Sequence, residues 1–218
     1  MKLVVFGASG ETGRHLVSLA AASGWTVRAC IRPGSAAATA ESAAHERAIG
    51  DPTDPAHVEA AVKGADAVAV CLGISRRTRS PFAALVSPPD LTSRSVAAIV
   101  GAMRAQSVQR IVYVSAFGAS ESWADIPGWG RLFIAASKVR YSMADHTRSE
   151  RMLAASGLDW TALRPMLLGD GRSEQAARPL QPGDSLLAKI PREALARSIL
   201  ECLGNPSTIG RAIPLAAP

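Results

Sequence analysis

The chain has 218 residues, of which 48% are hydrophobic and 19% charged, and its formal net charge at pH 7 is +6. These values are typical of a globular protein that buries a full core, and they exclude a chain that is disordered as a whole. No apolar run is long enough to cross a bilayer, and no charged leader precedes the first predicted strand at residue 2, so we expect a cytoplasmic protein without a membrane partner.

The excess of positive charge comes mainly from arginines that are scattered along the chain. It fits an anionic small ligand as well as nucleic acid, but no helix-turn-helix or zinc-finger pattern is present, so we expect no nucleic-acid partner. Cys30, Cys71 and Cys202 are odd in number and far apart. They predict neither a disulfide framework nor a metal site, and we interpret them as small core residues. The oligomeric state stays open between a monomer and a homodimer.

The first predicted element is an apolar strand over residues 2–6, which is followed by glycines and then by a helix over 12–23. Gly7 allows the sharp turn out of the strand, Gly10 leaves room for a pyrophosphate, and Gly13 lets the helix pack closely on the sheet. The spacing is G-x-x-G-x-x-G and not the commoner G-x-G-x-x-G, and an ordinary strand-turn-helix connection is the alternative. We expect nucleotide phosphates to bind this loop, at Gly7, Ser9, Gly10, Glu11, Thr12 and Gly13.

Strands and helices then alternate to the end of the chain. Further strands are predicted at 26–31, 46–50, 66–71, 109–115, 160–164 and 210–214. Further helices are predicted at 55–63, 91–106, 142–156 and 191–203, with a poorly formed Ala/Ser-rich segment at 35–45. This alternation predicts the α/β class, with residues 1–218 forming a single Rossmann-type domain: a doubly wound, mostly parallel sheet with helices on both faces.

The end of the second strand indicates which nicotinamide cofactor binds. It carries Arg32 and no acidic residue, which favours NADP(H) over NAD(H), because arginine suits a 2′-phosphate and an acid suits a free ribose hydroxyl. Arg14 is a second candidate for this phosphate, and a solvated strand-end charge is the alternative for Arg32. Asp51, after the third strand, either contacts adenine or caps the next turn, and capping is favoured.

Leu72 and Gly73 end the fourth strand, where backbone can lie along the cofactor ribose. Three long stretches, 74–90, 117–141 and 166–190, follow strand ends, which is where open α/β sheets bind ligands. Among their residues are aromatic side chains for which we weigh two roles, stacking on a flat ring and plugging a loop: Phe82, Trp123, Trp129 and Phe133.

Several motifs together resemble the atypical short-chain dehydrogenase/reductases of the NmrA-like and biliverdin reductase B (flavin reductase) type. They are the glycine loop, Ile49-Gly-Asp51 with the helix after it, Arg110-Ile-Val-Tyr-Val-Ser115, and Ser156-Gly-Leu-Asp-Trp-Thr-Ala-Leu-Arg-Pro165. The resemblance spans most of the chain. It implies a Rossmann-type domain that binds NADP(H), with the nicotinamide near Ser115 and Pro165.

The Tyr-x-x-x-Lys pair of the wider superfamily is missing, because Asp145 stands four residues after Tyr141. Carbonyl reduction with a tyrosine acid is therefore in doubt, whereas flavins and quinones accept hydride with little help beyond positioning. We expect an NADPH-dependent reductase of a small flat acceptor such as a flavin or a quinone. Ser115 and His146 are the expected catalytic residues. A strand-end hydroxyl that is satisfied by backbone is the alternative for Ser115. A surface histidine without a role is an equal alternative for His146, and Glu150 is expected to be a charge on a helix face.

The alternative function is a redox sensor that binds NADP(H) without turning it over, as NmrA-like proteins do. In that case the slot beside the nicotinamide is filled by loop side chains, and the basic run Arg76-Arg77-Thr78-Arg79 forms part of a partner surface. A solvated loop is the simpler interpretation of this run.

Overall fold

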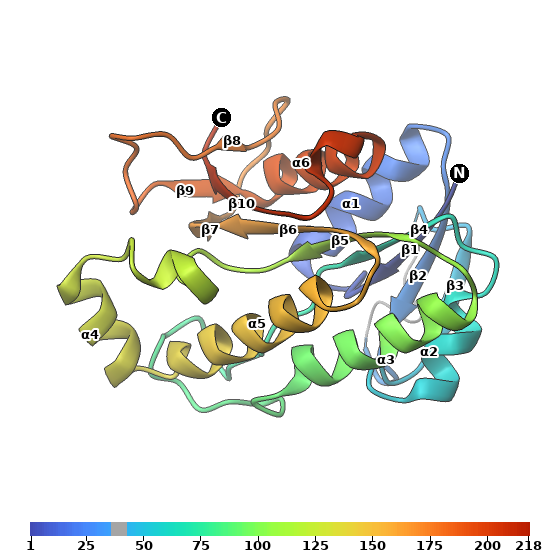
Figure 1. Cartoon of the computed structure of the whole chain (residues 1–218), viewed down its shortest axis with the longest axis horizontal. Helices are drawn as coiled ribbons and strands as arrows, with labels where there is room; N and C mark the ends of the chain where they lie inside the picture. The colour runs from blue at the N-terminus through green and yellow to red at the C-terminus, as the bar shows by residue number, and fades with distance from the viewer. Residues whose placement is uncertain (36–42) are drawn as a thin grey trace.

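The computed structural model describes residues 1–35 and 43–218 (Figure 1). Its main sheet has the strand order β3-β2-β1-β4-β5-β6-β10-β8. Neighbouring strands are parallel except for β8, which runs antiparallel to β10. The strands of this sheet are β1 (Lys2–Phe6), β2 (Thr26–Ile31), β3 (Glu46–Ile49), β4 (Ala67–Val70), β5 (Arg110–Val114), β6 (Asp159–Pro165), β8 (Arg178–Pro179) and β10 (Arg211–Ala216). A separate parallel pair joins β7 (Leu167–Gly169) and β9 (Lys189–Pro191).

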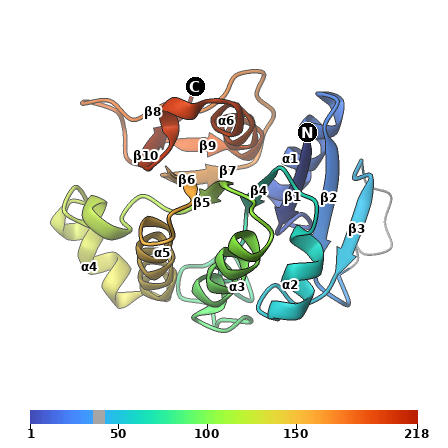
Figure 2. The same ribbon diagram turned by 45° about the vertical axis from the view of Figure 1, so that its right-hand side comes forward.

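Helices cover both faces of the sheet, as Figures 1 and 2 show. One face is covered by α1 (Glu11–Ala22) and α6 (Arg192–Gly204), and the other by α2 (Pro55–Val62), α3 (Leu91–Ala105) and α5 (Val139–Ala154). The helix α4 (Gly128–Ala136) lies at one end of the molecule, and η2 (Ser120–Trp123) and η3 (Pro206–Thr208) are short 3₁₀ turns. The predicted α/β class and doubly wound sheet are confirmed.

Strand β1 shows why helices have to pack on both faces of the sheet. Leu3 and Val5 belong to the core beneath α1 and α6, whereas Val4 and Phe6 belong to the core beneath α2, α3 and α5, and all four are fully buried. Successive side chains on a strand point to opposite faces, so an uninterrupted apolar run buries area on both sides. The continuous hydrophobicity of these strands is thus explained by their position inside the sheet.

The predicted strands are all present, and their ends lie within two residues of the expected positions. Helix α5 begins at Val139, three residues before the predicted start at 142, where the Ser137 hydroxyl accepts a hydrogen bond from the Val139 N–H. Most of the Ala/Ser-rich segment at 35–45 lies outside the described residues. The stretches 117–141 and 166–190 contain α4 and the short strands β7 and β8, which the sequence analysis did not predict. In the described ranges, no helix combines the length and apolar character needed to span a membrane.

Candidate functional site

A crevice of about 320 Å³ opens at the carboxyl ends of β1, β2 and β4. It lies where the strand order turns back at β1 and β4, which is the ligand-binding position of open α/β sheets. We call it the nucleotide crevice. Six of the predicted cofactor-binding residues line it: Gly7, Ser9, Gly10, Arg32, Leu72 and Gly73.

The glycine loop is shaped by close backbone contacts. Gly7 has a φ of +82°, and a Cβ atom there would lie 2.6 Å from the carbonyl oxygen of Cys71. A Cβ atom on Gly13 would lie 2.1 Å from the carbonyl oxygen of Gly7. Only glycine therefore permits this approach of the helix to the loop.

Helix α1 starts beside the crevice without a side-chain cap, because Gly10 is its N-cap residue. The first N–H groups of a helix have no partner within the helix, and the helix dipole favours an anion at that end. The arrangement fits a dinucleotide diphosphate, which accepts hydrogen bonds from such groups. The predicted phosphate role of this loop stays a prediction supported by the geometry.

Two of the predicted residues are engaged elsewhere through their side chains. Glu11 forms ion pairs with Arg79 at 2.9 Å and Arg192 at 2.9 Å, so its predicted contribution to phosphate binding would come from its backbone N–H in the first turn of α1. Asp51 Oδ1 accepts hydrogen bonds from the N–H and the hydroxyl of Thr53, each at 2.8 Å. Capping is therefore the role that Asp51 performs in this structure, as the sequence analysis favoured.

Arg32 is exposed at the end of β2, and no Asp or Glu is present among the described residues that line the crevice. This is the charge pattern expected for a 2′-phosphate. The preference for NADP(H) stays a prediction.

A second cavity of about 320 Å³, which we call the adjoining slot, shares Cys71, Leu72 and Gly73 with the crevice. Four predicted site residues from distant parts of the chain line it: Thr12, Ser115, His146 and Pro165. Cys71 follows β4 directly instead of lying inside the strand, and it is only partly buried. It packs against the hydrophobic core, as interpreted from the sequence, and it also forms part of the wall between the two cavities.

Ser115 lies at the start of a buried polar network. Its hydroxyl donates to Glu150 Oε1 at 2.6 Å, and Ser120 donates to Glu150 Oε2 at 2.5 Å. Arg164 donates to both oxygens of Glu150, at 2.9 and 2.7 Å, and also pairs with Glu121. Glu150 is 5% exposed, so the expectation of a charge on a helix face was wrong.

The charge of Glu150 determines what Ser115 offers to the slot. Burial by itself would raise the pKa of Glu150, but hydrogen bonds from Arg164, Ser115 and Ser120 hold this pKa below its ordinary value. An ionised carboxylate only accepts hydrogen bonds, so the Ser115 proton is directed to Glu150. The oxygen of Ser115 can then accept a hydrogen bond from a molecule in the slot.

His146 is buried rather than exposed on the surface of α5, which rules out the surface alternative. Its Nδ1 atom lies 2.5 Å from the hydroxyl of Tyr113. Burial lowers the pKa of His146 to about 4 and raises that of Tyr113, so near pH 7 the imidazole is neutral and the phenol keeps its proton. The hydroxyl of Tyr113 therefore donates a hydrogen bond to Nδ1, and the neutral imidazole carries its own proton on Nε2. His146 can present that N–H to the slot as a donor.

The sequence motifs did not identify Tyr113, Glu150 or Arg164 as parts of the site. Tyr113 lies in β5 and Ser115, two residues further on, directly follows this strand, and His146 and Glu150 are four apart on one helix. Each pair therefore shares a face. This periodicity was the available signal, but it does not say which strand meets which helix.

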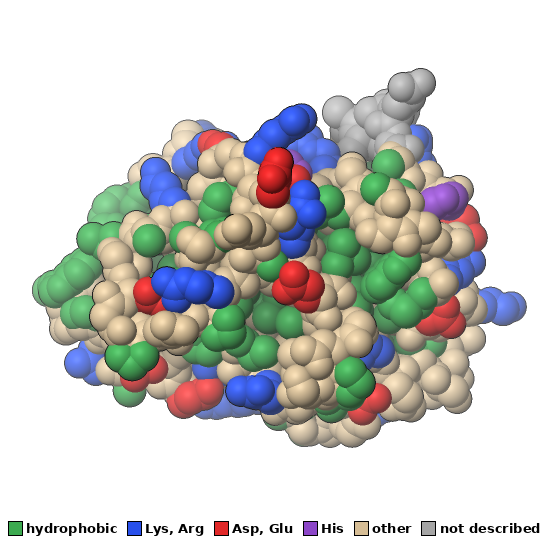
Figure 3. Space-filling model, turned by 90° about the horizontal axis from the view of Figure 1, so that it is seen from above, with side chains coloured by type: hydrophobic (Ala, Val, Ile, Leu, Met, Phe, Trp, Pro, Cys, Tyr) green, Lys and Arg blue, Asp and Glu red, His purple; other side chains and the backbone are tan. Residues whose placement is uncertain are grey.

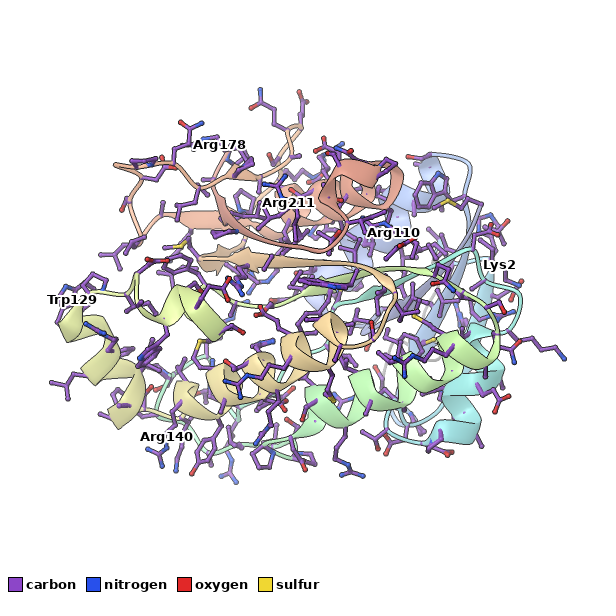
Figure 4. All side chains as sticks on the ribbon, viewed as in Figure 1. Lys2, Arg110, Trp129, Arg140, Arg178 and Arg211 are labelled. Carbon is purple, nitrogen blue, oxygen red and sulfur yellow. The ribbon has the colours of Figure 1, made fainter. Side chains whose placement is uncertain are left out.

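The aromatic residues of the long loops do not line the adjoining slot. Phe82, Trp129 and Phe133 are 58%, 64% and 46% exposed, and Trp129 points outward at the far end of the molecule (Figure 4). Exposed apolar side chains gather at this α4 end of the surface (Figure 3). The slot is lined instead by aliphatic and sulfur-containing side chains such as Ile74, Val139 and Met143. Of the two roles weighed for these three aromatic residues, stacking on a ring in the slot is not supported by their positions.

The NAD(P)H-binding family model matches residues 7–206. The chain belongs to this family. The resemblance drawn from the sequence motifs is thus confirmed at the level of an NAD(P)H-binding, oxidoreductase-like family.

The chain is also similar to individual proteins. It is 29% identical over 225 residues to a Bacillus subtilis (strain 168) protein named "Uncharacterized sugar epimerase YhfK", with 99% of this chain and 94% of that protein covered. Among solved structures, it resembles ChuY, described as an anaerobillin reductase from Escherichia coli O157:H7. The TM-score is 0.79 at 22% identity, over 100% of this chain and 98% of that one. It also resembles a Veillonella parvula short-chain dehydrogenase/reductase in complex with NADP. The TM-score there is 0.75 at 17% identity, over 100% and 94% of the two chains.

Proposed function

We propose that this protein is an NADPH-dependent reductase that delivers a hydride to a small flat acceptor such as a flavin or a quinone. One observation carries the proposal: the nucleotide crevice and the adjoining slot share the wall at Cys71, Leu72 and Gly73. A dinucleotide lying along the crevice reaches the slot with its nicotinamide end, and the slot has room for a second ring beside it.

The residues assigned to the cofactor are those of the glycine loop, Arg32, Leu72, Gly73 and Pro165, with Asp51 supporting the crevice from the following turn. Arg32 supports NADP(H) over NAD(H), since a guanidinium binds a 2′-phosphate at the end of β2. We further propose a cytoplasmic monomer or homodimer in which residues 1–218 form one domain, because the main sheet continues from β3 to β8.

When bound, NADPH would supply a hydride, which is one proton with two electrons, to the acceptor, and a proton from solvent would complete the reduction. The residues of the slot position the two rings and supply hydrogen-bonding groups to them. Ser115 accepts a hydrogen bond through its oxygen, and His146 donates one from Nε2. The aliphatic lining excludes water from the reacting faces.

Sugar epimerase chemistry, which the name of the Bacillus subtilis relative suggests, is not supported by the site. Asp145 occupies the position of the superfamily lysine, and its carboxylate accepts hydrogen bonds from the N–H groups of Thr92 and Ser93. Tyr141 lies beside Arg140 and is not among the described residues that line the slot. Because the similar protein ChuY is described as an anaerobillin reductase, a bilin joins the flat acceptors worth testing.

The test is to mix the purified protein with NADPH and each of riboflavin phosphate, menadione and a bilin, and to follow the loss of absorbance of the reduced nicotinamide. We expect oxidation of NADPH with at least one of these acceptors. Calorimetric titration with NADPH and NADH gives the binding constants independently. Tight NADPH binding without turnover of any acceptor would favour the redox sensor, and no binding of either nucleotide would refute both functions.

A further inference from the structure

Arg76 lines the adjoining slot and is partly buried. No carboxylate of the described residues pairs with its guanidinium, and its Nε atom is buried without a hydrogen-bond partner among them. The other described side chains that line the slot are uncharged, because His146 is neutral near pH 7. A partly desolvated charge without compensation is costly, so an anion at this place would be stabilised.

Neighbouring arginines behave differently. Arg79, three residues along the same loop, pairs with Glu11 at 2.9 Å and with Asp170 at 2.8 Å. Arg164, on the strand that ends at the slot, is held by Glu121 and Glu150. The uncompensated guanidinium of Arg76 is therefore not explained by a general shortage of acidic partners around the site.

The loop that carries Arg76 is held in place by its own backbone. The N–H of Arg77 donates to the carbonyl of Ala84 at 2.9 Å, and the N–H of Val86 donates to the carbonyl of Ser75 at 2.9 Å. The ion pairs of Arg79 attach the loop tip to the start of α1 and to the segment after β7. Little ordering of the loop is thus needed before Arg76 binds a ligand.

We propose that Arg76 binds a phosphate or carboxylate carried by the hydride acceptor, so that the slot selects anionic ring compounds over neutral ones. This inference rests on the proposed reductase function. A guanidinium offers two parallel donors that match the oxygens of either group. The cofactor phosphates are the other source of such an anion. Arg76 lines the slot and is not among the described residues that line the nucleotide crevice, which favours the acceptor.

The experiment compares riboflavin phosphate with riboflavin, which share one ring system and differ by the terminal phosphate. Both the KM in NADPH oxidation and the dissociation constant from quenching of flavin fluorescence are measured with the full chain. We expect the phosphate form to have a KM and a dissociation constant lower by about tenfold or more, as a charged hydrogen-bonded contact provides. Raising the salt concentration should weaken binding of riboflavin phosphate and leave riboflavin almost unchanged.

The decisive variant is Arg76→Ala, and Arg77→Ala is the matched control, because Arg77 is an exposed arginine next to it that does not line the slot. In Arg76→Ala the ratio of the two flavin constants should fall to about one, while the constants for riboflavin and for NADPH stay as in the wild type. In Arg77→Ala the ratio should be retained.

Three results would overturn the inference. Equal constants for the two flavins in the wild type would show that no anion is selected. A ratio that persists in Arg76→Ala would assign the selection to another residue. A loss of NADPH affinity in Arg76→Ala with an unchanged flavin ratio would assign Arg76 to the cofactor. Failure of the reductase function has a separate signature, which is no oxidation of NADPH with either flavin, menadione or a bilin.

Discussion

The hydroxyl of Ser115 and Oε1 of Glu150 are 2.6 Å apart, and the carboxylate is the acceptor. The proton of Ser115 is therefore directed into the protein, away from the adjoining slot. In the proposed reductase, Ser115 recognises a hydrogen-bond donor of the nicotinamide or the acceptor, and it cannot polarise a carbonyl group by donating to it.

Ser115→Ala should reduce kcat/KM with riboflavin phosphate by about two- to tenfold, which is the worth of one ordinary hydrogen bond. Steady-state NADPH oxidation measures it. Ser120→Ala is the matched control, because Ser120 donates to the other oxygen of Glu150 and is not among the described residues that line the slot. An equal loss in both variants would mean that the network as a whole, and not the oxygen of Ser115, is responsible.

Arg32→Asp should weaken NADPH binding at least tenfold, because it replaces the cation at the end of β2 by an anion facing the 2′-phosphate. NADH, which lacks this phosphate, should bind the variant about as well as it binds the wild type. Calorimetric titration with both nucleotides makes the comparison within one protein. Equal losses for NADPH and NADH would place the 2′-phosphate elsewhere.

Gly13→Ala should destabilise the fold by about 2 kcal/mol or more and weaken NADPH binding, because its Cβ would meet the carbonyl oxygen of Gly7 at 2.1 Å. Gly101→Ala is the control within a helix. A Cβ at Gly101 meets nothing within 4 Å, and alanine is favoured over glycine in a helix interior by about 1 kcal/mol. Urea unfolding should therefore show opposite signs for the two variants.

The pH dependence of stability should carry a contribution from His146. Its folded pKa of about 4 lies below the ordinary value of 6.5, so between these values the unfolded chain binds more protons than the folded protein. Stability should fall as pH decreases through this window, by roughly 3 kcal/mol from this group. His146→Gln should flatten the slope measured by urea unfolding between pH 7 and pH 5. Identical slopes would show that His146 does not stay neutral on folding.

The titration of carboxylates also changes stability with pH, so the pH range used for His146 has to lie above it. The pKa of Glu150 is depressed, so its contribution to stability is present above its ordinary value of about 4.5 and is lost as pH falls below it. The interval from pH 7 to pH 5 therefore isolates the histidine.

Asp145→Ala should destabilise the protein by about 2 kcal/mol, because its buried carboxylate accepts from the N–H groups of Thr92 at 2.8 Å and Ser93 at 3.2 Å. These groups begin α3, so Asp145 caps that helix from α5. Asp54→Ala is the control, since Asp54 is an exposed cap of α2 with a single bond to Ala56, and it should cost about 1 kcal/mol. Urea unfolding measures both, and a smaller loss for Asp145→Ala than for Asp54→Ala would contradict this role.

The strands, the main helices and the position of the glycine loop could be predicted from the sequence because they depend on neighbouring residues. The alternation of apolar segments with helical periodicity places each of the seven predicted strands within two residues of its observed ends. Gly7 and Gly13 are only six residues apart, and their backbones lie in close contact. Arg32 directly follows β2, as the sequence predicted. Local spacing also favoured the capping role of Asp51, whose partner Thr53 is two residues away.

The polarity of the site was decided by the tertiary structure. Ser115 and Glu150 are 35 positions apart, Tyr113 and His146 are 33 apart, and Thr92 and Asp145 are 53 apart. Whether Glu150 is a solvated charge or a buried partner depends on which strand its helix covers, and no local pattern contains that information. The sequence thus predicted where a dinucleotide would bind, whereas packing of α5 against β5 and β6 decided which atoms the slot presents, because burial and distant partners set the protonation of Glu150 and His146.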